Sequence, residues 1–279
     1  MKNELIHITG LLKKLYNADI ETYDLNFLEK ALNARMLVTQ IPAMNDYIKY
    51  IENHPSESKL FLDSTNISYS EFFRNPLTFS ILEKIVIPQL IVAQKKSGRK
   101  EIRIWSTACA SGQEAYSIAM LLEEFQLFRK EKIHFRIFAT DHSEDQINMA
   151  KIGVYTDNYV QSLTLKQLNN WFEKHGDVYS IKSELKKHID FSVFDLFNKE
   201  LESPPVSIFG NFDIVICANL LFYYKKKDQN NILNKLTKCI SPEGYFITGE
   251  TEREIISNNG FMEYYPYSAI FKASKKYID

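Results

Sequence analysis

The chain has 279 residues, of which 45% are hydrophobic and 25% are charged, and its formal net charge is −1 at pH 7. These values are ordinary for a globular protein with a large buried core, built as one large domain or as a large domain with a small companion. The near-zero net charge argues against general nucleic-acid binding, because proteins of that class usually carry a basic surface.

Cysteine use and hydropathy indicate a cytoplasmic protein. The three cysteines, Cys109, Cys217 and Cys239, lie far apart without a C-x-x-C pair, so a disulfide framework or a zinc knuckle is not expected. No signal-peptide pattern opens the chain, and no uninterrupted apolar stretch reaches the roughly 18 residues that span a membrane. We therefore expect a reducing compartment and no membrane insertion.

The first 66 residues have a helical pattern and are predicted to form a small N-terminal domain. Apolar residues recur at helical spacing from Leu5 to Leu15, and Asp24 is placed to cap a second helix through Met36. A third helix over 44–51 is predicted to end at the His54-Pro55 turn. Residues 54–70 are rich in Ser, Asn and Asp, and we expect them to form the linker to the next domain.

The stretch from Ile102 to Ser117 predicts a strand, a tight turn of small residues and a helix, which is how a nucleotide-type α/β unit opens. Its turn, residues 106–112, has one glycine, and the acid Glu114 follows in the first helical turn. A carboxylate there would repel a pyrophosphate, and both glycine-rich phosphate motifs are absent. The turn therefore predicts a nucleoside-like ligand that carries positive charge.

Alternating strands and helices predict an α/β domain over residues 67–279. A second strand over 134–140 ends at Asp141, and further strands are expected at 212–219 and 245–249, with a turn at 242–244 before the last. The alternation lapses for about forty residues, and we assign a small inserted β-subdomain to about 152–194, including a short strand at 189–194.

Several polar residues follow predicted strands directly. Because ligands bind beyond the carboxyl ends of parallel strands, we expect a site near the 106–112 turn, Asp141, Asp195-Leu196 and Asn219-Leu220. Taken singly, Asp141 could be a helix N-cap, Asp195 an Asx-turn residue and Asn219 a turn residue. Their joint occurrence favours a nucleoside site. The six histidines have no metal-ligand spacing, so no metal is expected.

The order of motifs from Tyr69 to Glu252 closely resembles that of the chemotaxis receptor methyltransferases (CheR). The matching motifs are Phe72-Phe73-Arg74, the run from Ile102 to Met120, F-A-T-D at 138–141, Asp195-Leu196, Cys217-Ala218-Asn219, Phe222-Tyr223-Tyr224 and the run from Pro242 to Glu250. This resemblance implies a small helical domain, a Rossmann-like methyltransferase domain and an inserted β-subdomain. It also implies transfer of a methyl group from S-adenosylmethionine to glutamate side chains of a chemoreceptor.

The resemblance also assigns residues. It places Arg74 and Tyr223 near the transferring methyl group as catalytic residues. The implied cofactor-binding residues are Ser68, Ser70, Arg74, Ala108, Glu114, Asp141, Asp195, Leu196, Asn219 and Leu220. The chemistry is consistent with this assignment, because Glu114 suits a cationic sulfonium and a glutamate carboxylate is already ionised at pH 7 without a metal or a strong base.

Two departures from the family leave other functions open. Ala218 replaces a family arginine, and the helix that carries several receptor-facing arginines in the family keeps only Lys30 and Arg35 here. One alternative is a signalling adaptor that binds S-adenosylmethionine or S-adenosylhomocysteine without methyl transfer. The other is a methyltransferase of this fold with another substrate. The sequence leaves the oligomeric state open, with a monomer favoured, and a receptor tail could bind the β-subdomain by strand addition.

Overall fold

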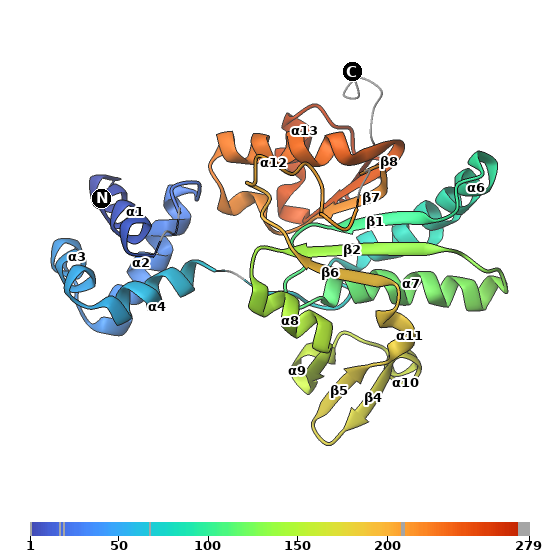
Figure 1. Ribbon diagram of the computed structural model, residues 1–279, viewed down its shortest axis with the longest axis horizontal. Coiled ribbons are helices and arrows are strands. Elements are labelled where there is room, and N and C mark those ends of the chain that lie inside the picture. Colours follow the sequence, from blue (N-terminus) through green and yellow to red (C-terminus); the bar gives the residue numbers. More distant parts are fainter. Residues whose placement is uncertain (1, 17, 19, 67, 208–209, 273–279) are drawn as a thin grey trace. The chain divides into compact units, whose positions relative to one another are not determined.

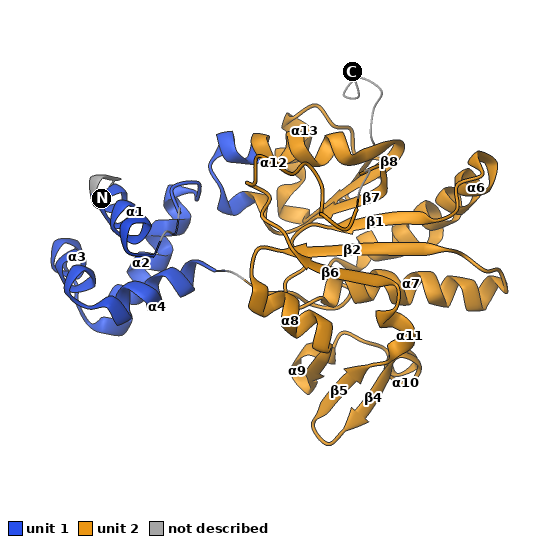
Figure 2. Ribbon diagram, viewed as in Figure 1, with its two compact units in different colours: residues 1–67, 222–229 blue, residues 68–221, 230–279 orange. Residues whose placement is uncertain are grey.

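The computed structural model describes residues 2–16, 18, 20–66, 68–207 and 210–272. The chain forms two compact units (Figure 2): one comprises residues 1–67 and 222–229, and the other comprises residues 68–221 and 230–279. They are called the helical unit and the α/β unit below.

Four helices form most of the helical unit: α1 (Lys2–Tyr16), α2 (Leu25–Thr39), α3 (Met44–Asn53) and α4 (Pro55–Thr65) (Figure 1). The prediction that Asp24 caps the second helix is confirmed, since its carboxylate accepts hydrogen bonds from the backbone N–H groups of Asn26 and Phe27. The apolar faces of the helices meet in a common core, whose fully buried members include Leu12, Leu32, Tyr47, Ile51 and Phe61.

The linker predicted for residues 54–70 is wrong over most of its length, because residues 55–65 form α4. Pro55 stands at the start of the helix, where its missing N–H costs no hydrogen bond. Phe61 is fully buried. Ser58 is also buried, and its hydroxyl donates a hydrogen bond to the carbonyl of Ile51 at 2.8 Å. The polar composition of this segment concealed the helix because three of its four buried residues, Glu57, Ser58 and Thr65, are themselves polar.

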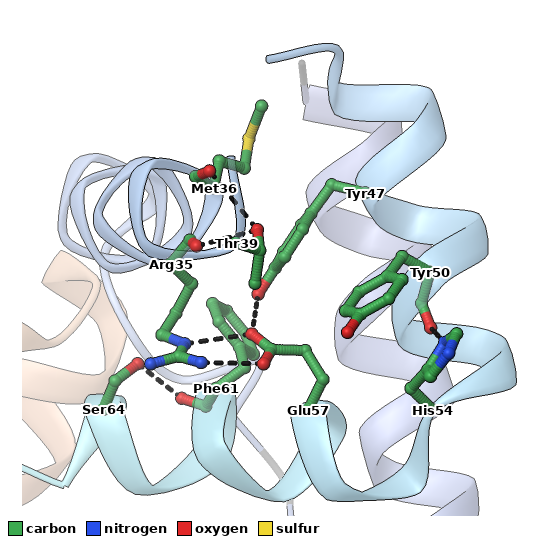
Figure 3. A network of polar contacts seen from close by, with 9 residues as sticks. All are labelled: Arg35, Met36, Thr39, Tyr47, Tyr50, His54, Glu57, Phe61 and Ser64. Carbon is green, nitrogen blue, oxygen red and sulfur yellow. Dashed lines mark hydrogen bonds and ion pairs between the residues drawn. The ribbon is translucent and has the colours of Figure 1, made fainter. Parts of the chain in front are cut away.

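A network of polar contacts joins three helices of this unit (Figure 3). Arg35 of α2 donates two hydrogen bonds to the carboxylate of Glu57 of α4, at 2.9 and 2.7 Å, and Tyr47 of α3 donates a third at 2.7 Å. Burial raises the pKa of Glu57, but the hydrogen bonds from Arg35 and Tyr47 outweigh it and leave the pKa below its ordinary value. Arg35 is therefore committed to the interior of the unit.

A six-stranded sheet organises the α/β unit, in the order β6-β2-β1-β7-β8-β9. The strands are β1 (Ile102–Ser106), β2 (Phe135–Asp141), β6 (Ile189–Val193), β7 (Phe212–Cys217), β8 (Ile240–Thr248) and β9 (Ile270–Lys272). All neighbouring pairs are parallel except β8 with β9. The turn expected at 242–244 lies within β8, as an irregularity where the pairing with β7 shifts.

Helices flank this sheet. A continuous helical segment comprises α5 (Pro76–Ile81), the π-helical turn η1 (Leu82–Val86) and α6 (Ile87–Ser97). The remaining helices are α7 (Gln113–Arg129), α8 (Glu144–Ile152), α12 (Lys226–Cys239) and α13 (Arg253–Asn258), with short 3₁₀ turns η2 (Leu221–Tyr223) and η3 (Glu250–Glu252).

The helical segment from Pro76 to Ser97 is long and apolar enough, by length and composition alone, to cross a membrane. Several of its apolar side chains, however, belong to the core of the α/β unit. Leu82, Val86 and Leu90 are buried there together with Ile102 and Ile104 of β1. This segment therefore packs as a core helix of the unit.

A small antiparallel sheet, in the order β3-β5-β4, is inserted between α8 and β6 (Figure 1). Its elements are β3 (Val154–Thr156), α9 (Asp157–Val160), α10 (Leu165–Trp171), β4 (Phe172–His175), β5 (Val178–Ile181) and α11 (Ser183–Lys186). The strand predicted at 189–194 is not part of this insertion. It is β6, the edge strand of the main sheet, and it pairs with β2. Its sequence resembles that of a subdomain strand because an edge strand is only half buried.

Candidate functional site

The strand order creates a crevice beside β1. The chain proceeds from β1 to β2 on one side of the sheet and later returns to β7 on the other, so the turns after β1 and β7 diverge. Such a switch point at the carboxyl ends of strands is where open α/β sheets bind ligands. A pocket opens there, and its lining residues are Tyr69, Ser70, Glu71, Arg74, Asn75, Phe79, Ala108, Glu114, Ala218 and Asn219.

The turn after β1 is packed closely against neighbouring elements. Gly112 has a φ of +93°, and a Cβ atom at this position would lie 2.9 Å from the Cβ of Ala150 in α8. The backbone N–H of Ala110, itself at a φ of +46°, donates to Asp141 Oδ2 at 3.0 Å. A glycine is therefore required at 112, and Asp141 at the end of β2 fixes the course of the turn.

Glu114 lies in the first turn of α7 and reaches the pocket from a partly buried position. Ser106, the last residue of β1, donates a hydrogen bond to its Oε1 at 2.6 Å. Burial raises the pKa of Glu114 to about 7, although the Ser106 hydrogen bond and the charge of Arg74 both act to lower it. The pocket thus holds a carboxylate whose negative charge is incompletely compensated.

Arg74 is presented to the pocket by a firmly anchored segment. Phe72 is fully buried, with its ring edge-on to Tyr155 at 5.0 Å and to Phe172 of the inserted subdomain at 5.6 Å. The backbone N–H of Phe73, which has a φ of +51°, donates to Ser117 Oγ of α7 at 3.0 Å. These contacts fix the backbone immediately before Arg74.

A single buried carboxylate organises the loop after β7. Glu252 accepts hydrogen bonds from the backbone N–H groups of Asn219, Leu220, Leu221 and Gly249 at 2.6 to 3.0 Å. It also accepts one from the Thr248 hydroxyl at 3.0 Å. Asn219, at a φ of +59°, is thereby held against the pocket.

Sequence reasoning gave Glu252 no role. Exposed acids flank it at Glu250 and Glu254, and no spacing or motif in the sequence distinguishes the buried carboxylate from these neighbours. Only its position in η3, facing the loop after β7, identifies it as the residue that shapes the Asn219 side of the pocket.

The pocket brings together five of the residues assigned from the sequence: Ser70, Arg74, Ala108, Glu114 and Asn219. Five other residues assigned to cofactor binding do not line it, namely Ser68, Asp141, Asp195, Leu196 and Leu220. The lining residues that sequence reasoning did not assign are Tyr69, Glu71, Asn75, Phe79 and Ala218.

Two of the assigned acids have clear local partners. Asp141, which is only 8% exposed, accepts from the N–H groups of Ala110 and Ser143, and α8 is capped by Ser143, so the N-cap alternative for Asp141 is wrong. Asp195 forms the Asx-turn considered as its alternative, because its Oδ1 accepts from the N–H of Phe197 at 2.8 Å. The strand before Asp195, β6, nevertheless ends beside Asp141, because its last residue, Val193, pairs with Asp141.

Tyr223 belongs to the helical unit through the segment 222–229. Its backbone carbonyl accepts a hydrogen bond from the N–H of Asp24 at 2.7 Å, and its ring lies 5.0 Å from that of Phe27. The next residue, Tyr224, forms an antiparallel bridge with Tyr23 and stacks on its ring at 5.0 Å. The predicted catalytic tyrosine is therefore held by residues at the start of α2.

Among the residues that the structure describes, no group of three or more His, Cys, Asp or Glu side chains is arranged to hold a metal ion. The three cysteines are buried, and burial raises the pKa of Cys109 and Cys217 well above the ordinary thiol value. Such thiols are poor nucleophiles near neutral pH. Cys109 packs in the core of the α/β unit as a small apolar residue.

Comparison with known proteins agrees with this geometry over both units. The family model described as "CheR methyltransferase, SAM binding domain" matches residues 68–267, and "CheR methyltransferase, all-alpha domain" matches residues 3–64. The chain is 28% identical to a chemotaxis protein methyltransferase of Borreliella burgdorferi over 269 residues, covering 94% of this chain and 92% of the relative.

Two further relatives carry the same name. The chemotaxis protein methyltransferase of Listeria innocua is 26% identical, with 91% of each chain covered. That of Escherichia coli is 28% identical, with 74% of this chain and 68% of the relative covered. With both family models matched in order along nearly the whole chain, this protein belongs to the CheR family of S-adenosylmethionine-dependent methyltransferases.

Proposed function

We propose that the chain transfers a methyl group from S-adenosylmethionine to glutamate side-chain carboxylates of a chemoreceptor. The observation that carries the proposal is that Arg74 and Glu114 both line one pocket at the switch point of the sheet. One supplies a guanidinium for an acidic substrate, and the other supplies a carboxylate for a cationic cofactor.

The residues present fit S-adenosylmethionine. Burial leaves Glu114 with a pKa of about 7, so a cationic ligand beside it would relieve the cost of its ionisation. The wall includes two small residues, Ala108 and Ala218, and Asn219 provides an amide. When bound, the cofactor supplies a methyl group on a positively charged sulfur that leaves as a neutral thioether.

Asp141 is proposed to hold the ribose hydroxyls from the end of β2. Its two backbone hydrogen bonds, from Ala110 and Ser143, use only part of the acceptor capacity of a carboxylate. Ser68, Ser70, Asp195, Leu196 and Leu220 stay predictions as cofactor contacts, with Ser70 supported by its position in the pocket lining.

Arg74 is proposed to align the substrate. A glutamate carboxylate is ionised at neutral pH and is itself the nucleophile, so the site has no need of a general base. The site must still orient the substrate carboxylate. A guanidinium offers a planar fork that matches a carboxylate and stays charged at every physiological pH. Tyr223 stays a prediction as the second catalytic residue, on the family resemblance alone.

Docking of a receptor through a basic surface of α2 is not part of the proposal. Arg35 is held by Glu57 inside the helical unit, which leaves Lys30 as the exposed basic residue of α2. We propose a cytoplasmic monomer that meets the cytoplasmic part of its receptor. The relatives named above are chemotaxis methyltransferases, which supports a receptor substrate.

The test is incubation of the purified chain with methyl-labelled S-adenosylmethionine and membranes of the source organism. A base-labile label on a receptor-sized band is the expected result, because a glutamyl methyl ester is cleaved by mild alkali. If no label appears while S-adenosylhomocysteine still binds the protein, the proposal fails and the adaptor is favoured.

A further inference from the structure

The guanidinium of Arg74 lies against an aromatic ring at the edge of the pocket. Its Cζ is 5.3 Å from the centroid of the Tyr69 ring, within the range of a cation–π contact. Both residues line the pocket, and Tyr69 is 64% exposed. An exposed tyrosine contributes little to the core, so core packing does not explain the tyrosine at this position.

Arg74 has few other groups to fix its orientation. Within the residues that the structure describes, no carboxylate oxygen lies within 4.0 Å of its guanidinium, in contrast to Arg35 and Arg253, which each donate two hydrogen bonds to one glutamate. A long arginine side chain without such a partner samples several rotamers. The Tyr69 ring is thus the partner that restricts it.

The charges of the other pocket-lining residues make the orientation of Arg74 important. Arg74 is the only basic residue among the lining residues of the pocket, and it shares them with two acids, Glu71 and Glu114. An arginine that turned to pair with either acid would no longer be available to bind a substrate carboxylate. The hydroxyl of Tyr69 lies 3.5 Å from Glu71 Oε2 and donates to it, so the same tyrosine contacts the guanidinium and the nearer acid along the chain.

We propose that Tyr69 is a positioning residue, whose ring holds the Arg74 guanidinium in the orientation that receives the substrate carboxylate. The inference rests on the proposed function, because it requires Arg74 to align a carboxylate. Tyr69 contacts neither reacting atom in this scheme and acts only through Arg74.

The test compares Tyr69→Leu with Tyr69→Phe in the full chain, by kcat/KM for methyl transfer to receptor membranes. Loss of the ring should lower kcat/KM about two- to fivefold, the effect of one exposed cation–π contact, and more if substrate excludes water from it. The phenylalanine variant keeps the ring and should recover most of that loss. The affinity for S-adenosylhomocysteine should change little in either variant.

Tyr267→Leu is the matched control. Its ring also lies under an arginine, Arg253, at 4.9 Å, and it is exposed, but it does not line the pocket. Removing this second cation–π contact should leave methyl transfer unchanged. An equal loss in Tyr267→Leu and Tyr69→Leu would overturn the proposal, because the effect would then be one of general stability.

A double-mutant cycle with Arg74→Lys separates this inference from the function on which it rests. If Tyr69 acts through Arg74, Tyr69→Leu should cost less in the Arg74→Lys background than in the wild type. Equal costs in the two backgrounds would refute the positioning role and leave the proposed function intact. Full transfer by Arg74→Lys and Arg74→Ala would refute the proposed role of Arg74 itself.

Discussion

Ser106 Oγ donates a hydrogen bond to Glu114 Oε1 at 2.6 Å, which ties the end of β1 to the first turn of α7. This single neutral donor is the closest partner of a carboxylate whose pKa burial has raised to about 7. The pocket therefore holds a group that changes its charge near physiological pH.

Binding of the cofactor product should depend on that charge. Because S-adenosylhomocysteine carries an ammonium group, its binding favours ionised Glu114, and the dissociation constant should fall several-fold as the pH rises from 6 to 8. Calorimetry in two buffers of different ionisation enthalpy should show proton release on binding near pH 7. In Glu114→Gln the affinity should be weaker, and this pH dependence should disappear.

The same residue should lower the stability of the ligand-free protein at alkaline pH. The folded state binds a proton at Glu114 that the unfolded state has released, so stability falls as the pH rises from the ordinary pKa of 4.5 through about 7. Glu114→Gln should therefore be more stable than the wild type at pH 8, by about 1 to 3 kcal/mol, and lose that advantage at pH 5. Denaturant unfolding at both pH values checks this.

The ion pair of the helical unit should fail in acid. The pKa of Glu57 is below its ordinary value of 4.5 in the folded protein, so its contribution is complete above that value and is lost as the pH falls through the folded pKa. Arg35→Met leaves the carboxylate buried without its partner and should destabilise the unit by about 3 kcal/mol. Hydrogen exchange of the α2 and α4 amides in the full chain measures this loss.

An exposed pair in the same unit provides the comparison. His7 Nε2 lies 2.7 Å from Glu52 Oε1, with side chains 56% and 37% exposed. Since solvent screens such a pair, Glu52→Gln should cost less than about 1 kcal/mol. Protection in α2 and α4 that falls equally in Glu52→Gln and Arg35→Met would contradict a structural role for the Arg35–Glu57 pair.

Gly112→Ala should damage the pocket, because an added Cβ would meet Ala150 at 2.9 Å in a backbone conformation with a φ of +93°. We expect loss of S-adenosylhomocysteine affinity and destabilisation by more than the 1 to 2 kcal/mol or so that the left-handed conformation alone costs. Gly98→Ala is the control, since Gly98 has a φ of +67° but open space around the added atom. The two variants should differ in both measurements, and equal losses would refute the packing argument.

Glu252→Gln should loosen the loop after β7, since an amide cannot accept all the hydrogen bonds from Asn219, Leu220, Leu221 and Gly249 with the same geometry. The expected loss is about 2 to 4 kcal/mol of unfolding free energy, together with weaker S-adenosylhomocysteine binding. Glu254→Gln, at an exposed neighbour, should change neither quantity measurably. Wild-type affinity in Glu252→Gln would show that the Asn219 loop is not part of the cofactor site.

Much of the fold was accessible from sequence because its signals are local. The β-branched and aromatic run of β1, the small-residue turn and the long apolar run of α7 follow one another directly, so strand, turn and helix could be predicted together. The errors arose where local signals are ambiguous. The polar composition of residues 55–65 concealed the helix α4, and the edge position of β6 could only be seen from its pairing with β2.

The site was partly predictable for a similar reason. Arg74, Glu114 and Asn219 stand in motifs that follow strands or precede helices, so their position at one edge of the sheet could be inferred. Tyr69 and Glu252 could not be identified in this way. Glu252 acts through contacts with residues about thirty positions earlier in the chain, and Tyr69 acts through the long side chain of Arg74. Neither kind of contact leaves a periodic pattern in the sequence.

Methyl transfer by Arg74→Ala, measured beside calorimetric titration of the same variant with S-adenosylhomocysteine, tests whether Arg74 aligns the substrate. Transfer to receptor membranes should fall by at least about 100-fold, since alignment of the reacting groups is the main contribution that the site supplies, while the product should still bind with an affinity within about tenfold of the wild type. Transfer at the wild-type rate by Arg74→Ala would refute this role of Arg74.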